Sequence, residues 1–506
     1  MTPFDDVQRR LGEALDANRA GSGVDHVLIV LPSYSVSESI LSHYGNRIAS
    51  LEHRYLNALL IADRIRSCEI LFISTRRPDA ATLDGYFDLV PADRRDEVRS
   101  RVALLDIDDG TPRSVAAKLL DREDLLDEIR RRVGARPALI EPWNVTDAEV
   151  ALAVALGVPI NGTRPELRGL GFKSEGRRVL ARAGVPIPLG REDVRTVDDV
   201  LAAIHAIRIE RPMAPGIVIK HDDSGAGDGN VVIDVGPLDD PRDPDGTLRV
   251  RIAGLPEWYL SDLQQGGVVE ERIAGNRFMS PSAQVDIRPD GRVIVLATHE
   301  QILGGESGQV YLGCRFPADG AYAPALATYG EAVGRVLASQ GAVGRFSVDF
   351  VAASAGDAGA PADDAIDGGG RSNGWSVYGI EINLRKGGTT HPYAALRNVV
   401  PGRYDPAAGR WISESGDTRV YSATDNLVDS AWQGLSPAAV IQAVRLAGVL
   451  FDPATRTGVI LHMLAGLAID GRFGLTAIAD TTAAADAMQA EVKAAVDRLA
   501  ESTRPG

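Results

Sequence analysis

Three side chains with oxygen ligands lie on two strand-like segments of the chain. Asp349 belongs to one apolar, β-branched run, and Glu381 and Asn383 belong to a second. Side chains on a strand alternate between its two sides, so Glu381 and Asn383 share a side and Asp349 can face them from a neighbouring strand. Hard oxygen ligands at this density suit Mg²⁺, which proteins hold through one or two carboxylates plus substrate phosphates. A single acid at a strand edge is usually a solvated charge, but these three, followed directly by Arg385, favour a metal–nucleotide site.

A glycine-rich hairpin follows the strand-like run that ends at Lys220. Its turn includes Ser224, Gly225 and Gly227, and a second apolar run, Val231–Ile233, returns after it. Glycines let the backbone approach a phosphate and present its N–H groups, while the lysine supplies a cation. The order is not that of a P-loop, because the lysine precedes the glycines and no helix follows. Taken alone, the turn would be read as a flexible hairpin.

Two further segments could contribute to a nucleotide site. Lys173 begins a helical stretch, and an apolar strand runs into Glu270 and Glu271, shortly before Ile273. Such a strand end can offer a carboxylate and backbone groups to the amino edge of adenine, and Lys173 can add a second cation for phosphates. Taken one at a time, each is more simply explained as a solvated charge at the end of an element.

The N-terminal part of the chain predicts a parallel α/β domain over residues 1–165. Its strand-like runs are Val27–Leu31, Glu69–Ser74, Val102–Asp106 and Ala138–Ile140. Helices are expected between or after them, including one long helical stretch over residues 38–66. Strands that alternate with helices argue for a parallel sheet with both faces covered. A low-complexity stretch over residues 353–374 is interpreted as a surface insertion between the two ligand-bearing strands.

Length, charge and cysteine content narrow the class of protein. The 506 residues suffice for two or three domains of ordinary globular composition. A formal net charge of −15 argues against nucleic acid as a partner. No apolar run has the length of a transmembrane helix and the acidic N-terminus does not resemble a signal peptide, so no membrane partner is expected. Cys68 and Cys314 lie far apart and form no metal or redox motif, which fits a reducing cytoplasm.

In their order along the chain, these motifs resemble those of ATP-grasp ligases. The run Glu381–Pro392 and the N-terminal domain narrow the resemblance to peptide ligases of the pheganomycin type, and it covers nearly the whole chain. The resemblance implies an α/β and α+β fold. A pre-ATP-grasp domain would span 1–165 and an ATP-grasp core, with ATP between two β-sheet subdomains, would span 166–400. A small, mostly helical C-terminal domain would span 401–506.

The resemblance also implies roles for the residues that match the family's motifs. Those expected to hold ATP are Lys173, Lys220, Ser224, Gly225, Gly227, Glu270, Glu271 and Ile273, the last three at adenine. Those expected to bind Mg²⁺ are Asp349, Glu381 and Asn383. Those expected to contact substrate are Arg385, Lys386, Gly387, Gly388, Thr389, His391 and Arg315. The catalytic charges would come from Arg385, which faces the transferred phosphoryl group, and Lys220. Arg277 stands where several ATP-grasp ligases have a ribose-binding glutamate, which leaves the ribose ligand open.

The family reaction joins a carboxylate to an amine through an acyl-phosphate. The carboxylate attacks the γ-phosphate of ATP, and the amine then displaces phosphate and forms an amide. The protein must place the groups in line and neutralise the charge of the transferring phosphoryl group, a task that suits Mg²⁺, Lys220 and Arg385. His391 is either a proton acceptor for the amine or a buried structural histidine. The segment 304–309, shortly before Arg315, is either a substrate loop or a plain turn.

Two alternatives stay open beside a peptide ligase. One is an ATP-grasp ligase that acts on single amino acids or thiols, and the other is a nucleotide-binding protein without turnover. The intact set of Asp349, Glu381, Asn383 and Arg385 argues against the second. The expected cofactors are ATP and Mg²⁺. The expected partners are small-molecule carboxylates with amines or peptides, with a homodimer as one option, and the expected location is the cytoplasm.

Overall fold

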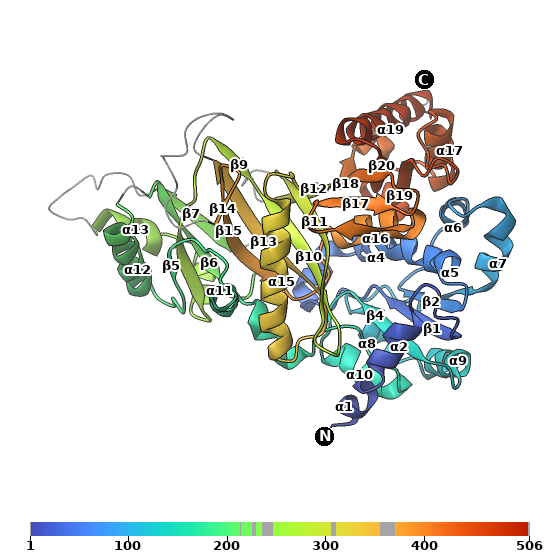
Figure 1. Cartoon of the computed structure of the whole chain (residues 1–506), viewed down its shortest axis with the longest axis horizontal. Coiled ribbons are helices and arrows are strands. Elements are labelled where there is room, and N and C mark those ends of the chain that lie inside the picture. The colour runs from blue at the N-terminus through green and yellow to red at the C-terminus, as the bar shows by residue number, and fades with distance from the viewer. Residues whose placement is uncertain are drawn as a thin grey trace.

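The computed structural model describes residues 2–212, 214–224, 229–234, 246–304, 310–354 and 370–503. Strands in this part of the chain form three sheets, which follow one another along the long axis of the molecule (Figure 1). A parallel sheet belongs to the N-terminal part, a small antiparallel sheet forms a lobe at the opposite end, and a large sheet lies between them and continues into the C-terminal part.

The N-terminal sheet has four parallel strands in the order β3-β2-β1-β4. These strands are β1 (His26–Leu31), β2 (Cys68–Ser74), β3 (Val102–Asp106) and β4 (Ala138–Pro142). Every residue of β1 is buried, as a continuous apolar run between two helical layers predicts. The helices around this sheet are α1 (Pro3–Gln8), α2 (Leu11–Ala17), α6 (Ala80–Phe87), η2 (Ala92–Arg94), α7 (Arg95–Ser100), α8 (Val115–Leu120), α9 (Glu123–Val133) and α10 (Asp147–Leu156). The predicted parallel α/β arrangement is confirmed.

The long helix expected over residues 38–66 is instead four short helices. They are α3 (Glu38–Tyr44), α4 (Arg47–Glu52), η1 (His53–Leu60) and α5 (Ile61–Arg64). Gly45 ends α3 with a φ of +50°, a conformation that a helix cannot continue through and that glycine adopts without strain. The helical spacing of apolar residues is preserved across these breaks, which is why the sequence pattern did not reveal them.

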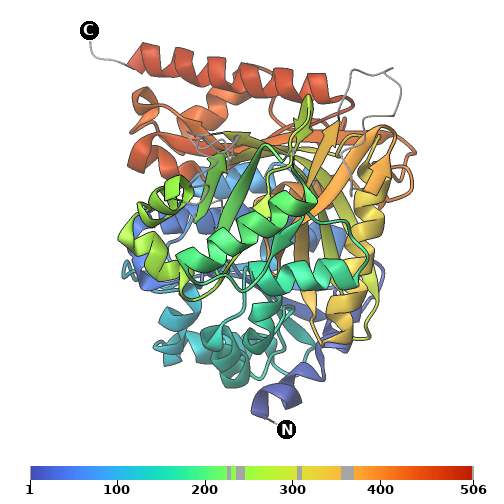
Figure 2. The ribbon, with the colours of Figure 1, turned by 90° about the vertical axis from the view of Figure 1, so that its left-hand side faces the viewer.

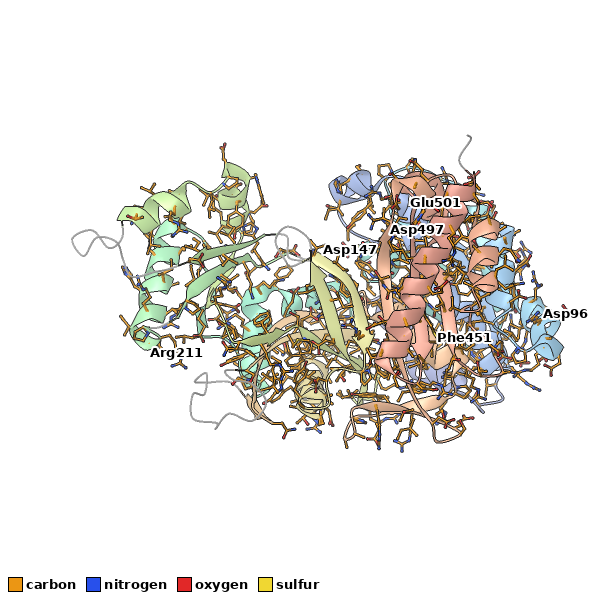
Figure 3. The ribbon with its side chains drawn as sticks, turned by 90° about the horizontal axis from the view of Figure 1, so that it is seen from above. Asp96, Asp147, Arg211, Phe451, Asp497 and Glu501 are labelled. Atoms are coloured by element: carbon orange, nitrogen blue, oxygen red, sulfur yellow. The ribbon has the colours of Figure 1, made fainter. Side chains whose placement is uncertain are left out.

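The small lobe is built on an antiparallel sheet in the order β5-β8-β6-β7. Its strands are β5 (Gly190–Arg191), β6 (Gly216–His221), β7 (Asn230–Asp234) and β8 (Gly267–Glu271). The hairpin expected at the glycine-rich turn is confirmed, with Lys220 of β6 opposite Asn230 of β7. The helices of this region are η3 (Pro165–Gly171), α11 (Lys173–Arg182), α12 (Val197–Glu210), α13 (Gly246–Ala253) and α14 (Glu257–Leu263). Seen from above, the lobe lies at one end of the molecule (Figure 3).

The large sheet follows the order β14-β15-β13-β10-β11-β12-β18-β17-β16, with β9 paired to β13, and β20 paired to β18 and β19. Its strands up to residue 383 are β9 (Arg277–Met279), β10 (Pro281–Ile287), β11 (Val293–Gly304), β12 (Val310–Phe316), β13 (Gly344–Ser354), β14 (Gly370–Ser372) and β15 (Trp375–Asn383). Helix α15 (Ala323–Ser339) packs across one face of β10 and β11 (Figure 1). The other face is therefore left to carry polar side chains.

The C-terminal part differs from the mostly helical domain that was expected. It adds the strands β16 (Gly402–Asp405), β17 (Arg410–Ser413), β18 (Thr418–Val428), β19 (Gly458–His462) and β20 (Arg472–Ala479). Its helices are α16 (Thr390–Val399), η4 (Ser430–Trp432), α17 (Pro437–Leu446), η5 (Leu464–Gly466), α18 (Leu467–Asp470) and α19 (Thr482–Thr503). Strand β18 pairs with β12, so the sheet crosses residue 401 without a break. The domain limits at 166 and 401 stay predictions. Helix α19 covers β18 and β20 along the C-terminal end of the molecule (Figure 2).

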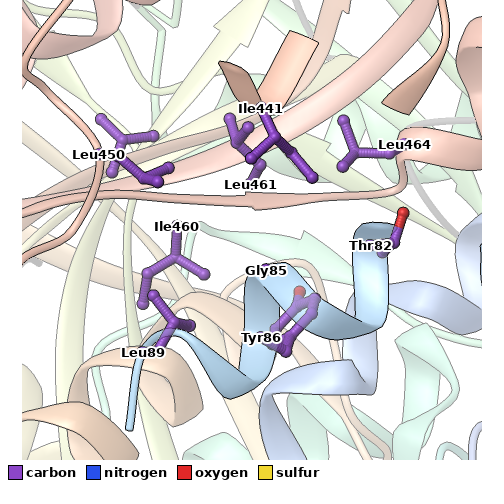
Figure 4. A pocket seen from close by; sticks show the side chains of 10 residues that line it. Thr82, Gly85, Tyr86, Leu89, Ile441, Leu450, Ile460, Leu461 and Leu464 are labelled. Atoms are coloured by element: carbon purple, nitrogen blue, oxygen red, sulfur yellow. The ribbon is translucent and has the colours of Figure 1, made fainter. Parts of the chain in front are cut away.

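The N-terminal and C-terminal parts share a hydrophobic core. One buried cluster contains Leu28 of β1 and Phe72 of β2 together with Tyr421 of β18 and Ile478 of β20. At the edge of this contact, α6 faces β19 and α17 across an apolar cavity of about 20 Å³ (Figure 4). That volume is scarcely more than one water molecule needs, so this contact is packing between elements. Among the described helices, none combines the length and apolar character that crossing a bilayer requires.

Candidate functional site

The structure brings Asp349, Glu381 and Asn383 together on one face of the large sheet. Strands β13 and β15 are antiparallel neighbours, and Asp349 is the register partner of Glu381. Asn383 Nδ2 donates to Asp349 Oδ2 at 2.9 Å. The side-chain amide oxygen of Asn383 is left as a further candidate metal ligand. A residue that the sequence did not single out completes this group, because Gln301 Nε2 of β11 donates to Asp349 Oδ1 at 3.0 Å.

The electrostatics of this group fit a divalent cation. Burial, reinforced by the like charge of Glu381, raises the pKa of Asp349 to about 7, although Arg385 and Lys173 act in the opposite direction. The charged form of Asp349 is disfavoured by burial and by a neighbouring carboxylate, and a bound cation would stabilise it. Carboxylate and amide oxygens are the hard ligands that Mg²⁺ takes. The residues present therefore fit the expected Mg²⁺.

Lys173 connects the large sheet to the small lobe. It lies at the first residue of α11, and its ammonium group donates to Glu381 Oε1 at 2.9 Å and to the carbonyl oxygen of Ser224 at 2.8 Å. Ser224 lies in the turn between β6 and β7, and its own hydroxyl donates to the His221 carbonyl. Gly225 and Gly227 lie outside the described residues. One buried cation thus joins the metal-ligand candidates to the hairpin expected to hold phosphates.

Lys220 lies in a buried cluster of charges at the end of β6. Its ammonium group pairs with Glu270 Oε2, and Arg177 Nη1 of α11 donates to Glu270 Oε1 at 2.5 Å. Burial alone would raise the pKa of Glu270, but Lys220 and Arg177 more than offset this effect and hold it below its usual value. Arg177 also pairs with Glu192 at 2.6 Å. Glu270, itself held by Arg177, therefore fixes the position of the Lys220 ammonium group.

This geometry changes the expectation for adenine. Both oxygens of Glu270 are already engaged, so its carboxylate positions Lys220 and Arg177 instead of being free to accept from a ligand. Glu271 points to the other side of β8, where Oε1 accepts from the Leu189 backbone N–H at 2.8 Å. Backbone groups near Ile273 remain candidates for the adenine edge. Arg277, at the position where a ribose ligand was in doubt, lies over the Trp375 ring at 4.6 Å.

Arg385 lies at the boundary between the large sheet and the N-terminal part. Its guanidinium lies 5.0 Å from the centre of the Trp143 ring, and Trp143 follows β4 directly. The Trp143 ring in turn packs on Tyr34, with ring centres 4.6 Å apart. Nη1 donates to the Lys386 carbonyl oxygen at 3.1 Å, and the other N–H donors of the stacked guanidinium are left for a phosphoryl group or a carboxylate. Arg385 is partly exposed on the side of the sheet that carries Asn383.

The residues after Arg385 were expected to contact substrate, and most are buried against the protein instead. Lys386 is 6% exposed and pairs with Glu141 of β4 at 2.7 Å. Thr389 is also buried, and its hydroxyl accepts from Gln284 Nε2 at 3.1 Å. Gly387 donates its backbone N–H to the Thr390 hydroxyl, while a Cβ at Gly388 would lie 2.6 Å from the Tyr311 ring. The polar groups of this segment bond to other groups of the protein, so the segment holds the start of α16 in place.

His391 belongs to a second buried cluster, at the C-terminal part. Asp425 Oδ1 of β18 lies 3.0 Å from His391 Nε2 and 2.7 Å from His462 Nε2. The three ligand atoms lie within 4.8 Å of one another, an arrangement that could hold a metal ion. However, Arg54 already forms an ion pair with Asp425 at 2.9 Å. The contacts of His391 and His462 with Asp425 also have the lengths of ordinary hydrogen bonds. Burial lowers the pKa of His391 to about 4 against the attraction of Asp425, so the structural interpretation of His391 is favoured over a proton acceptor.

Arg315 does not join the candidate site. On β11 and β12, Gln301 is paired with Cys314 and Glu300 with Arg315. Paired residues share a face, so Arg315 lies on the face opposite Gln301 and Asp349. There it pairs with Asp486 of α19 at 3.0 Å. The structure therefore gives no support to the expected substrate role of Arg315, which stays a prediction; of the adjacent segment, residues 305–309 lie outside the described residues.

Three residues of the site escaped the sequence-based reasoning: Gln301, Trp143 and Arg177. Gln301 ends a polar run, Thr298–Gln301, inside a long strand, and that departure from apolar alternation was a usable signal. The signal for Trp143 was weaker: it is a large aromatic residue directly after a buried parallel strand, and ligand sites are frequent at such strand ends. Nothing local distinguished Arg177 from the many other arginines of this chain.

Comparisons with known proteins show which proteins this chain is similar to. Residues 439–492 match the family described as PGM1 C-terminal domain. The L-propargylglycine–L-glutamate ligase of Streptantibioticus cattleyicolor is 33% identical over 433 residues, which cover 82% of this chain and 83% of that protein. Among solved structures, biotin carboxylase from Campylobacter jejuni, crystallised with an ATP analogue, matches with a TM-score of 0.53 at 13% identity over 94% of this chain and 95% of that chain. The ADP complex of purK, N5-carboxyaminoimidazole ribonucleotide synthetase, matches with a TM-score of 0.51 at 12% identity over 94% and 98% of the two chains. The structural matches show the ATP-grasp fold.

Proposed function

This chain belongs to the pheganomycin-type family of ATP-grasp ligases, and we propose that it joins the carboxylate of one amino acid to the amine of another. As a member of that family, it is an ATP-dependent ligase that forms a carbon–nitrogen bond from a carboxylate and an amine, with ATP and Mg²⁺ as cofactors. The choice of amino acids as substrates is supported by the relative's two substrates, propargylglycine and glutamate, which are both amino acids.

One observation carries the proposed site. Lys173 contacts both Glu381 of the large sheet and Ser224 of the lobe hairpin, so the phosphate end of a nucleotide between the two sheets would meet this lysine beside the oxygen ligands. Asp349, Glu381 and Asn383 are the proposed Mg²⁺ ligands. Bound there, Mg²⁺ would neutralise phosphate charge and favour in-line transfer.

The protein's own residues would supply binding and position. Lys173 and Lys220 would hold phosphate oxygens, and Glu270 with Arg177 would keep Lys220 in place. Arg385, backed by the Trp143 ring, would bind the transferring phosphoryl group with two N–H donors and so offset the charge that develops in the transition state. The acyl-phosphate must also be shielded from water, a task that the hairpin after Lys220 could perform by closing over the nucleotide.

The substrate carboxylate is proposed to bind between Arg385 and the end of β4. The Trp143 ring, which packs on the buried Tyr34 and on Arg385, would offer an apolar surface for a short side chain. Lys386 and Glu141 close the floor of this region as a buried ion pair and leave no charge of their own for the substrate. Selection among amino acids would then rest on the shape of the aromatic wall and on the fork of Arg385.

The test is an assay of phosphate and ADP release with pairs of amino acids, in which mass spectrometry identifies the product. We expect release that requires two amino acids and yields a dipeptide. Release only with peptides or with thiols as acceptor would replace the amino-acid proposal by another ligation within the same family. Nucleotide binding with no substrate-dependent release in any pair would contradict it. The homodimer and the cytoplasmic location stay predictions.

A further inference from the structure

A large cavity lies at the edge of the N-terminal sheet that is opposite to the candidate site. Its volume is about 800 Å³. Asp25 and Ser67, which precede β1 and β2, line it, whereas Trp143 of the candidate site follows β4. Since these strands are parallel, the cavity and the candidate site lie at opposite ends of the sheet. The cavity is therefore separate from the proposed nucleotide and substrate positions, and it is large enough for an organic metabolite.

Arg64 in the wall of this cavity lacks an acidic partner. It is the last residue of α5 and is partly buried. Its Nε is inaccessible to solvent and has no hydrogen-bond partner, and no ion pair to Arg64 exists among the residues described. The nearby acid Asp63 is already held by Arg94 at 3.0 Å. The remainder of the side chain lines the cavity, so a partly buried arginine without an acidic partner faces the space where an anion could bind.

A second arginine behind Arg64 adds to the excess of positive charge. Arg397, near the end of α16, also has an Nε that is buried without a hydrogen-bond partner, and its guanidinium lies 6.0 Å from the Tyr393 ring. Burial, together with repulsion by Arg397, lowers the pKa of Arg64 to about 10. The acids further inside are already engaged, because Glu141 pairs with Lys386 at 2.7 Å and Asp286 with Arg345 at 3.5 Å. Burial outweighs the attraction of Tyr393, Glu141 and Asp286 and holds the pKa of Arg397 below its usual value.

The remaining charges in the wall do not remove this excess. Arg66 and Arg456 add two more cations to the wall, while Asp25 and Glu414 are exposed acids. The buried end of the cavity is thus positive and its exposed part is mixed. A ligand that places an anionic group at Arg64 would be drawn inwards, since charge-assisted hydrogen bonds are stronger where water is excluded.

We propose that this cavity is a binding site for a small organic anion with two or more negative charges, held through a phosphate or carboxylate group by Arg64. Its fork of N–H donors suits either group. The segments that line the site include the end of α5, the end of α16 and the loop at residues 453–456. Filling it would join N-terminal and C-terminal parts of the chain and raise the stability of the whole fold.

The test uses the full chain at constant ionic strength, without Mg²⁺ and with ADP in excess to fill the nucleotide position. Inorganic phosphate and citrate are the two probes, with chloride as the reference anion, and the readouts are thermal unfolding and titration calorimetry. We compare wild type with Arg64→Gln, with Arg64→Lys and with Arg410→Gln, which removes one exposed arginine on β17. In wild type, at least one probe should raise Tm. A response to phosphate alone identifies a phosphorylated ligand, and one to citrate alone identifies a polycarboxylate.

Arg64→Gln should weaken binding of the active probe by about tenfold or more, because a charge-assisted contact is lost. In chloride, the same variant should be at least as stable as wild type, since it removes an uncompensated buried charge. Arg64→Lys should retain part of the response, and Arg410→Gln should retain all of it. A wild type that responds to neither probe would overturn the proposal. An Arg64→Gln variant whose Tm responds to the probe like wild type would also overturn it. The proposal would fail as well if Arg64→Gln is markedly destabilised in chloride while Arg64→Lys binds the probe like wild type.

Discussion

Lys173 Nζ lies 2.9 Å from Glu381 Oε1, although the two residues are 208 positions apart in the chain. The contact joins a helix of the small lobe region to a strand of the large sheet, and the same ammonium group also donates to the Ser224 carbonyl. One side chain therefore fixes the distance between the proposed metal ligands and the hairpin that is proposed to cover phosphates.

Glu381→Gln should abolish ADP release and leave the fold intact. The amide removes one proposed metal carboxylate and leaves the Lys173 ammonium without its counter-charge, so the maximal rate should fall by about 100-fold or more. A coupled assay of ADP release, together with thermal unfolding, measures both effects. Glu331→Gln, on the exposed side of α15, is the matched control and should behave like wild type. Wild-type turnover in Glu381→Gln would disprove the metal assignment.

Mg²⁺ binding should strengthen as pH rises through 7. The pKa of Asp349 is raised to about 7, so this group carries a proton below that pH and must lose it to bind a cation. From this single group, the affinity should be about tenfold weaker at pH 6 than at pH 8. Calorimetry in buffers of different ionisation enthalpy should detect the released proton. Equal affinity at the two pH values, with no proton release, would argue against Asp349 as a ligand.

The same group should make the metal-free protein less stable as pH rises from about 4 to 7. Because the native state holds this proton more tightly than the unfolded chain does, the native state binds more protons across that window, and the advantage is lost once pH exceeds the raised pKa. Urea unfolding at pH 5 and pH 8, for wild type and Asp349→Asn, isolates the contribution. The variant should lack this component of the pH dependence.

Glu270→Gln should destabilise the small lobe. Lys220 and Arg177 would then face each other without a shared carboxylate, and breaking a buried ion pair from one side costs about 3–5 kcal/mol. The free energy of unfolding in urea measures this cost, with Glu331→Gln again as the exposed control. Adding Lys220→Met to Glu270→Gln should recover part of the loss, since it removes the cation that has lost its carboxylate partner, whereas Arg177 keeps its pair with Glu192. If Glu270→Gln is as stable as wild type, the ion pairs of Glu270 with Lys220 and Arg177 do not contribute to stability.

Arg385→Lys should lower the maximal rate much more than it weakens ATP binding. Lysine keeps the charge but not the two-donor fork or the stacking on Trp143, and the rate should fall on the order of 100-fold if the fork acts in the transition state. ADP-release kinetics and nucleotide titration separate the two effects. Arg335→Lys on α15 is the control with the same change at an exposed position. A lower ATP affinity with an unchanged rate would make Arg385 a ground-state ligand.

Arg315→Gln should leave turnover within about twofold of wild type, because Arg315 lies on the face of the sheet that carries α19. Gln301→Leu, on the neighbouring strand but the opposite face, should reduce turnover, because it removes the N–H donor to Asp349. Kinetics of both variants under identical conditions give the comparison. The opposite ranking would return Arg315 to the site and remove Gln301 from it.

Local pattern was enough to predict much of this molecule. Strand β1, the β6–β7 hairpin and the alternation of Glu381 and Asn383 follow from apolar spacing and turn residues that lie close together in the sequence. The failures concern register between distant segments. Whether Arg315 shares a face with Asp349 depends on how β11 and β12 pair, and a shift of one residue reverses the answer. Similarly, Lys386 reads as a free cation until Glu141 of another sheet is placed beside it.

The pairing of β12 with β18 has a consequence for how the chain is made. Strand β12 ends at Phe316 and its neighbour begins at Thr418, so during synthesis β12 leaves the ribosome long before the strand that covers its edge exists. Until then, β12 presents unpaired N–H and C=O groups to any other strand nearby. The nascent chain is therefore open to wrong pairing at this edge while the ribosome translates the segment between these two strands.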